Sequence, residues 1–429
     1  MRTLLATLCL LALPALPAAE TATPLAILGE TVHTLAGPAV KDGLVLVRDG
    51  RVTYAGPAAG RAVPADHRVL RAKVVTPGLI DARATAGLSG ILNQPQDQDM
   101  LDRSAPLQPE LRAIDAYNAR DPLVAWVRSF GITTLNTGHA PGALVSGQTM
   151  IVRTAGHSVE DDVINPAAMI AVSLGGSAVN RAEGPPGGAA KSPGTRAKAV
   201  AMLRAELIKA QEYARKREAK DETKRPARDL RLETLARGLE GSQRFLITAH
   251  RQQDILAALR LAREFNLRIV LDGCADAPLV LDEIKASGFP VILHPTMARA
   301  SEDTENLAMD TAARLAAAGI PFTFQSGYEG YVPKTRVILF EAALAAARGL
   351  GFERALAAVT LDAARILGVD ERTGSLAAGK DADLALFDGD PFEYTSHVTA
   401  TVVAGRVFAD GPRRRPAAPR SGADLAHQP

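Results

Sequence analysis

Three polar side chains follow three consecutive apolar runs, at a spacing that could bring them together. His250, Asp272 and His294 each come directly after a short run of apolar residues. If these runs are neighbouring strands of a parallel barrel, their carboxyl ends lie on one face and the three side chains could converge there. Two imidazoles and a carboxylate suit a divalent metal, or proton transfer near neutral pH without one. We therefore take the three as candidate catalytic residues.

Two further segments carry polar groups toward the same predicted face. His139 lies in 138–142, where its ring and the backbone could grip a substrate carboxylate or carbonyl; a purely structural tight turn is an equal alternative. The segment 326–331 follows the last predicted barrel strand and is suited to a substrate lid, with a plain loop as the alternative. The candidate substrate-contacting residues in and next to this segment are Gln325, Ser326, Tyr328 and Glu329.

The elements that would position these residues alternate between short strands and helices. Four strand–helix units are predicted: 245–249 with 254–265, 268–271 with 279–287, 291–293 with 308–318, and 322–324 with 336–348. Their spacing favours a TIM-type (β/α)8 barrel over residues 76–371 rather than an open sheet. The charged stretch 197–237 is predicted to be an outer helix pair.

Both ends of the chain have a different texture, with short alternating strands. Residues 44–47 and 51–54 flank Asp49-Gly50, a pair that favours the turn of a β-hairpin because it tolerates positive φ. Similar short runs return near the C-terminus. We therefore predict a small β-sandwich built from both chain ends, over 24–75 and 372–411.

Composition excludes several classes of protein. The chain has 429 residues, a net charge of +2, 47% hydrophobic residues and two cysteines. Such a balance leaves no basic footprint for nucleic acid, and two cysteines cannot build a disulfide framework or a thiolate zinc cluster. No window is long and apolar enough for a transmembrane helix. We expect a globular protein that acts on a small molecule, with no nucleic-acid partner and no membrane span.

The two termini predict export and a flexible tail. Residues 1–19 carry a positive charge at Arg2, continue with an apolar run and end in small residues, which is the pattern of a cleavable signal peptide. We expect an exported, periplasmic protein whose mature chain keeps only Cys274. Residues 412–429, rich in Pro, Ala and Arg, are expected to be disordered.

Two motifs resemble the amidohydrolase superfamily, in its imidazolonepropionase-like and prolidase-like branch. Val74-Val75-Thr76-Pro77-Gly78-Leu79-Ile80-Asp81 is similar to the segment that enters the first barrel strand, and 361–368 followed by 374–384 is similar to the last helix and its return. The resemblance implies a barrel enzyme that hydrolyses C–N bonds other than peptide bonds, in cyclic amides or dipeptide-like substrates. It also implies one or two divalent metals that activate water.

The positions at which the resemblance implies metal ligands carry other residues here. The two histidines expected after Asp81 are replaced by Arg83 and Thr85, and the sixth-strand histidine by Asp272. Thr248 falls at the fifth-strand position and Gly327 at the last-strand aspartate. An arginine cannot ligate a metal. We therefore predict no metal at the family positions and no cofactor, with zinc as an alternative only at a relocated His250, Asp272 and His294 set.

Two hypotheses for the function remain open. In the first, the chain is a hydrolase that uses the relocated set, with Arg83 and Thr85 among the substrate contacts. In the second, Arg83 fills the place of the metal and pairs with Asp272, so that a degenerate site folds without chemistry. The chain would then be an inactive, metal-free binding or assembly partner of an active amidohydrolase. Homo-oligomers, or association with such a relative, fit either hypothesis.

Overall fold

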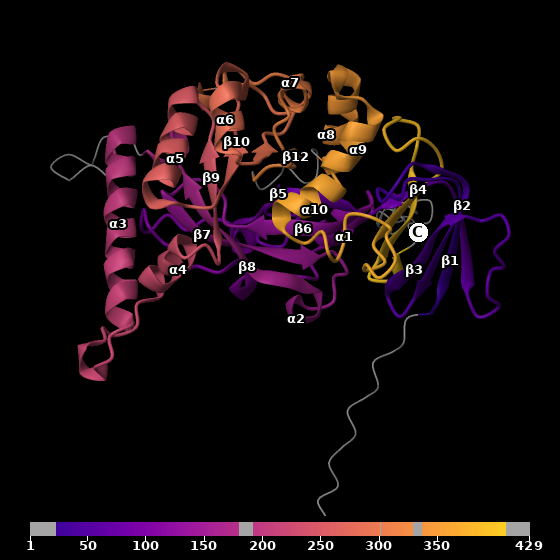
Figure 1. Cartoon of the computed structure of the whole chain (residues 1–429), viewed down its shortest axis with the longest axis horizontal. Helices are drawn as coiled ribbons and strands as arrows, with labels where there is room; N and C mark the ends of the chain where they lie inside the picture. Colours follow the sequence, from indigo (N-terminus) through magenta and orange to yellow (C-terminus); the bar gives the residue numbers. More distant parts are fainter. Residues whose placement is uncertain (1–22, 180–191, 301, 329–336, 409–429) are drawn as a thin grey trace, which may run out of the picture.

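The computed structural model describes residues 23–179, 192–300, 302–328 and 337–408, and it forms two sheets joined side by side (Figure 1). The predicted signal peptide and tail, and Glu329, lie outside these residues. No helix among the described residues is long and apolar enough to cross a membrane.

A seven-stranded sheet is built from both ends of the chain, as the sequence predicts. Its order is β15-β14-β13-β4-β1-β2-β3. The strands are β1 (Leu25–Val32), β2 (Val40–Arg48), β3 (Arg51–Pro57), β4 (Arg68–Pro77), β13 (Leu384–Phe387), β14 (Val398–Val403) and β15 (Arg406–Phe408). Asp49 and Gly50 make the β2–β3 turn, both with positive φ. The strands pair as one continuous sheet, and not as two separately hydrogen-bonded layers.

The second sheet has eight strands in chain order and forms a nearly closed barrel, because its outer strands β5 and β12 contact each other. The strands are β5 (Leu79–Ala84), β6 (Ile132–Gly138), β7 (Val145–Arg153), β8 (Val163–Ser173), β9 (Arg244–Ala249), β10 (Ile269–Gly273), β11 (Val291–Leu293) and β12 (Phe322–Phe324). The four predicted strand–helix units are confirmed by β9–β12 and the helices that follow them.

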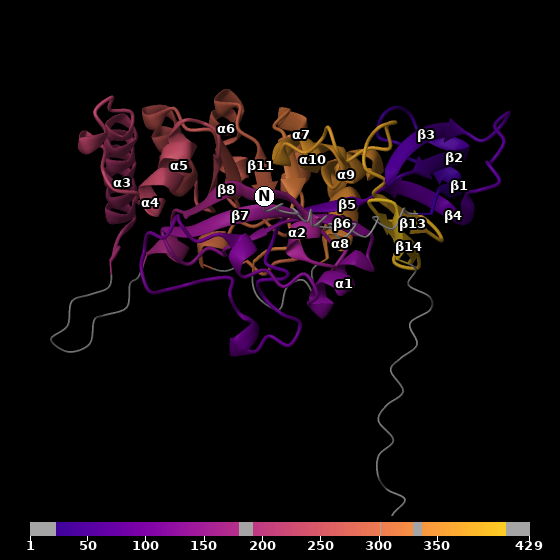
Figure 2. The same cartoon turned by 90° about the horizontal axis from the view of Figure 1, so that it is seen from below.

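One strand departs from the predicted (β/α)8 repeat. β7 runs antiparallel to both β6 and β8. The cause is local: only residues 139–144 join β6 to β7, and a parallel crossover needs a dozen or more. The segment before α1, through the bridges Leu107–Val145 and Arg112–Gln148, covers β7 in place of a helix. Figure 2 shows this purple segment on the other side of the strands from α5, α6 and α7.

The helices pack against the outside of the barrel, and α10 fills its amino-terminal end. They are α1 (Pro122–Arg128), α2 (Val159–Asp162), α3 (Arg196–Arg217), α4 (Leu230–Leu239), α5 (Gln252–Phe265), α6 (Leu281–Ser287), α7 (Thr311–Ala318), α8 (Ile338–Ala345), α9 (Phe352–Ala358) and α10 (Leu361–Leu367). α3 and α4 are the predicted outer pair. Ile366 and Leu367 of α10 pack with inward-facing Val270 and Ile292, so the amino-terminal end of the barrel is filled.

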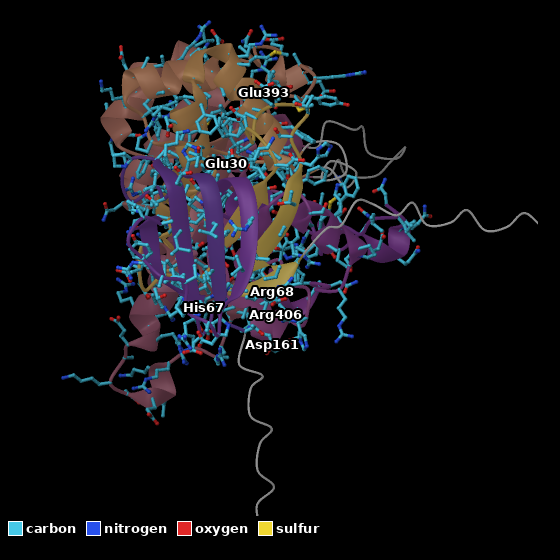
Figure 3. The ribbon with its side chains drawn as sticks, turned by 90° about the vertical axis from the view of Figure 1, so that its right-hand side faces the viewer. Glu30, His67, Arg68, Asp161, Glu393 and Arg406 are labelled. Atoms are coloured by element: carbon cyan, nitrogen blue, oxygen red, sulfur yellow. The ribbon has the colours of Figure 1, made fainter. Side chains whose placement is uncertain are left out.

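The two sheets are held together by buried charge. Asp381 forms ion pairs with Arg153 of β7 and with Arg372, and its side chain is only 6% exposed. Figure 3 looks onto the seven-stranded sheet and shows Arg406 of β15 beside Asp161 of α2, where sheet and barrel meet. These contacts fix the sheet against the barrel and leave the carboxyl ends of the barrel strands for a functional site.

Candidate active site

A cavity of about 300 Å³ lies at the carboxyl ends of the barrel strands. Its wall includes His250 after β9, His294 after β11 and Tyr328 after β12. The wall is completed by Gly176, Pro295, Ala298, Arg299, Glu302, Asp303, Thr304 and Leu307. This is the face at which barrel enzymes place their active sites. The structure thus brings two of the three candidate catalytic residues into one cavity.

His294 is buried and has one ring nitrogen without a partner. Its Nδ1 lies 3.1 Å from the carbonyl oxygen of Pro295, which can only accept, so Nδ1 carries the proton. Nε2 has no hydrogen-bond partner among the described residues. Burial, more than any other cause, lowers the pKa of His294 to about 4. At neutral pH the ring is therefore uncharged, with the Nε2 lone pair available in the cavity wall.

His250 and Tyr328 form the second polar pair of the cavity. The Nε2 atom of His250 lies 3.1 Å from the Tyr328 hydroxyl. The ring of His250 approaches β10 closely: a Cβ built on Gly273, whose φ is +87°, would be 2.5 Å from Cε1. Glycine is therefore required at this strand end, both for its backbone conformation and for the space that the imidazole fills.

Asp272 does not join the two histidines in the cavity wall. Its Oδ1 accepts a hydrogen bond from Gln325 Nε2 at 2.6 Å, and its Oδ2 accepts one from Thr248 Oγ1 at 2.5 Å. All three side chains are buried, on β9, on β10 and at the end of β12. Both carboxylate oxygens are thus engaged by neighbouring strands. Gln325, predicted to contact substrate, donates to Asp272 through Nε2, and its Oε1 has no partner among the described residues.

Arg83 is fully buried at the end of β5, and its guanidinium makes one hydrogen bond within the described residues. Its Nη2 donates to the carbonyl oxygen of His139, and Nε and Nη1 have no partner among the described residues. Burial lowers the pKa of Arg83, while Asp272, Tyr328 and Asp81 raise it. The expected direct pair with Asp272 is wrong: no ion pair joins them in the described part of the chain, because the oxygens of Asp272 face Thr248 and Gln325.

Asp81 is a further buried carboxyl of the site that was not predicted from the sequence, although it lies in the motif before Arg83. It is fully buried, and its Oδ1 accepts from the backbone N–H groups of Ser326 at 3.1 Å and Arg83 at 3.2 Å. Burial raises the pKa of Asp81 to about 6, against the opposing effect of these hydrogen bonds. Ser326 therefore contributes its backbone to joining β12 with β5. The motif itself was the signal that could have identified Asp81.

The remaining candidates from β5 and β6 lie deeper than the cavity wall. Thr85, at the second expected histidine position, is fully buried and its Oγ1 has no partner among the described residues. His139 is 5% exposed, and burial followed by the charge of Arg83 lowers its pKa to about 4. It is the carbonyl of His139, and not its ring, that contacts Arg83.

A group of ion pairs holds the outer wall of the cavity, and no motif in the sequence predicts it. Asp303 accepts a hydrogen bond from the backbone N–H of Gly176 and forms ion pairs with Arg196 and Arg251. Arg251 also pairs with Glu305. Residues 302–307 are thereby anchored to the segment after β8, to α3 and to the β9–α5 loop.

The residues at the mouth do not fit the metal that the resemblance implies. Arg83 has no lone pair to offer, and Thr85 and Thr248 supply only neutral hydroxyls. In the described ranges, no three His, Cys, Asp or Glu side chains come together in a way that could hold a metal ion. The relocated metal set is therefore wrong: His250, Asp272 and His294 do not converge, because Asp272 is turned toward β9 and β12.

Comparison with known proteins gives a consistent result. The model of the Amidohydrolase family matches residues 333–409. The imidazolonepropionase of Xanthomonas oryzae pv. oryzae is 26% identical over 378 residues, covering 82% of this chain and 88% of that protein. The crystal structure of an amidohydrolase from Thermotoga maritima MSB8 superposes with a TM-score of 0.83 and 26% identity, over 90% of this chain and 100% of that one. The chain belongs to the amidohydrolase superfamily.

A more distant relative agrees with the fold of this amidohydrolase. A prolidase crystallised with N-methylphosphonate-L-proline superposes with a TM-score of 0.56 and 15% identity, over 90% of this chain and 100% of that one. The predicted superfamily membership is thus confirmed. This chain carries Arg83, Thr85 and Thr248 at positions where the resemblance implies metal ligands.

Proposed function

We propose that this amidohydrolase cleaves a carbon–nitrogen bond other than a peptide bond in a small cyclic amide or dipeptide-like molecule. The observation that carries the proposal is His294, a neutral imidazole whose Nε2 has no partner, in the wall of a 300 Å³ cavity at the barrel mouth. The similarity to imidazolonepropionases supports the substrate class.

The residues of the cavity can supply the proton transfers of hydrolysis. Nε2 of His294 takes a proton from a water molecule, whose oxygen bonds to the substrate carbonyl carbon. The C–N bond then breaks, and the Tyr328–His250 pair, joined at 3.1 Å, gives a proton to the leaving nitrogen. The proton held on His294 passes to solvent and the pair takes one back from solvent, which restores both groups. Asp272 takes no direct part, since Thr248 and Gln325 occupy its oxygens. We propose that these steps replace the superfamily's metal-activated water, with no metal at the family positions.

The proposal is tested by a hydrolysis screen of the purified protein. Hydantoin, dihydrouracil and N-acetyl-L-proline are incubated with the wild type, and products are followed by liquid chromatography and mass spectrometry. We expect ring opening or release of proline that is lost in His294→Ala and kept in His157→Ala, a control in which the histidine is exposed and remote from the cavity. Equal rates for both variants would contradict the role of His294.

A second candidate function is binding without catalysis. It is favoured by the same network, because an Asp272 held by two neighbours and a buried Arg83 keep the barrel mouth folded without any reaction. The chain would then act as a binding or assembly partner of an active amidohydrolase. Ligand binding in the screen with no product from any compound would support this candidate over the hydrolase.

We also propose that the protein is exported to the periplasm through the signal peptide at 1–19 and acts there on a small molecule. Homo-oligomer formation and association with a metal-bearing relative remain proposals. Fractionation of cells that express the full chain, with amino-terminal sequencing of the mature protein, tests export. An intact Met1 in the cytoplasmic fraction would contradict it.

A further inference from the structure

Arg83 is the largest fully buried side chain of the described residues, yet most of its guanidinium is unused. A buried cation is normally paired and hydrogen-bonded, since desolvation is costly. Here Nη2 reaches the carbonyl of His139, while Nε and Nη1 have no partner in the described part of the chain. The fold thus keeps hydrogen-bond donors of a cation at the barrel mouth without using them itself.

Other polar atoms at the same strand ends are also without partners. They are Thr85 Oγ1 after β5, His294 Nε2 after β11 and Gln325 Oε1 after β12. Each of these side chains is at most 1% exposed. Gln325 also links this group of atoms to Arg83. Its Nε2 donates a hydrogen bond to Asp272, and Asp272 is the carboxylate that raises the pKa of Arg83 most. Buried polar atoms without partners on three strands indicate that a bound molecule completes the hydrogen bonding.

The charges around Arg83 favour an uncharged oxygen over a full anion. Asp272 and Asp81 both raise the pKa of the guanidinium, and the same two carboxyl groups would repel an anionic ligand. Tyr328, which also raises the pKa of Arg83, lines the cavity, whereas Arg83 itself is fully buried and is not among the lining residues. A carbonyl oxygen accepts hydrogen bonds without bringing a charge, and it gains negative charge only when its carbon is attacked.

We propose that Arg83 is the electrophilic anchor of the site, donating hydrogen bonds to the carbonyl oxygen of a bound amide, lactam or imide. When water attacks the carbonyl carbon, the electron pair of the C=O bond moves to this oxygen, and Arg83 holds the charge while remaining protonated. The pair then returns as the C–N bond breaks and the nitrogen takes a proton. In this site a side-chain cation would thus do what the metal does in metal-bearing relatives. The inference rests on the proposed hydrolase function for this step.

The test measures polarisation of the carbonyl group, which does not require turnover. Hydantoin labelled with ¹³C at one carbonyl is bound to the wild type, Arg83→Met and Arg83→Lys, and its infrared stretch and dissociation constant are measured. Arg204→Met removes an arginine from the surface and is the matched control. We expect a lower carbonyl frequency in the wild type and the control, loss of that shift in Arg83→Met, and a dissociation constant raised roughly tenfold or more.

Arg83→Lys keeps a buried cation and protects the test against misfolding of the methionine variant. We expect a smaller shift in this variant, because an ammonium cannot reproduce the guanidinium geometry. An unshifted carbonyl in the wild type, or the same shift in Arg83→Met or Arg83→Lys, would overturn the inference even if hydantoin is hydrolysed. Failure of the wild type to bind the labelled hydantoin would also overturn it. A carbonyl shift that depends on Arg83, without any hydrolysis, would support the role of Arg83 in binding the carbonyl oxygen and would contradict the proposed hydrolase function.

Discussion

Asp81 gives the sharpest test of the electrostatics at the barrel mouth. Its carboxyl is fully buried, and its pKa is raised from 3.8 to about 6. A carboxyl whose pKa is raised by folding stabilises the folded state below its unfolded value, and this contribution is lost as the pH rises through about 6. At about 1.4 kcal/mol for each tenfold change in acidity, the loss is about 3 kcal/mol. The asparagine in Asp81→Asn cannot ionise, so the variant does not lose this stability as the pH rises.

We therefore expect Asp81→Asn to gain stability relative to the wild type as the pH rises. The free energy of unfolding is measured by urea titration at pH 4 and pH 7.5, followed by the fluorescence of Trp126, the single tryptophan. The difference between variant and wild type should grow by about 2.4 kcal/mol in favour of the variant, because about 0.6 kcal/mol of the full change is already lost at pH 4. Asp115→Asn is the control, because Arg112 lowers the pKa of that carboxyl. A difference that stays constant or falls with pH would refute the reasoning.

Three further predictions concern the cavity and its support. Because the pKa of His294 is about 4, hydrolysis should fall only below about pH 4, and a kcat/KM profile with a midpoint near 6.5 would contradict the base. Gly273→Ala places a Cβ 2.5 Å from the His250 ring and should lower both the melting temperature and kcat. Gly288→Ala is the control, because Gly288 has a positive φ but nothing within 4 Å, and it should show only the backbone cost of about 1–3 kcal/mol. Asp381→Ala leaves a buried arginine of β7 unpaired and should cost about 3–5 kcal/mol in urea titration; an unchanged midpoint would show that this pair does not hold the sheets together.

The sequence predicted the second half of the barrel well, because each short apolar run there is followed by a helical pattern. The direction of β7 could not be predicted from the sequence. The residues Val145–Arg153 have the same strand character whether they run parallel or antiparallel, and only the shortness of the 139–144 connection decides the direction. The pairing of both chain ends was predictable from their shared texture, whereas the order of the seven strands was not.

The site was predicted by position more successfully than by contact. His250 and His294 lie in the cavity, as strand ends in a barrel imply. Asp272 does not, because its oxygens are taken by Thr248 and Gln325, and which hydroxyl or amide a buried carboxylate meets depends on barrel register. The partner of Arg83 is a backbone carbonyl, which has no signature in a sequence.

The central claim is that this barrel mouth performs its chemistry with Arg83 and His294 in place of metal ligands. The most direct measurement is the hydrolysis rate of the best substrate as a function of bound metal, determined by elemental analysis on chelator-treated and zinc-reconstituted protein. We predict a rate that is unchanged at substoichiometric metal and abolished by His294→Ala. Stoichiometric zinc that restores a lost rate, and that is itself lost in His294→Ala, would contradict the account.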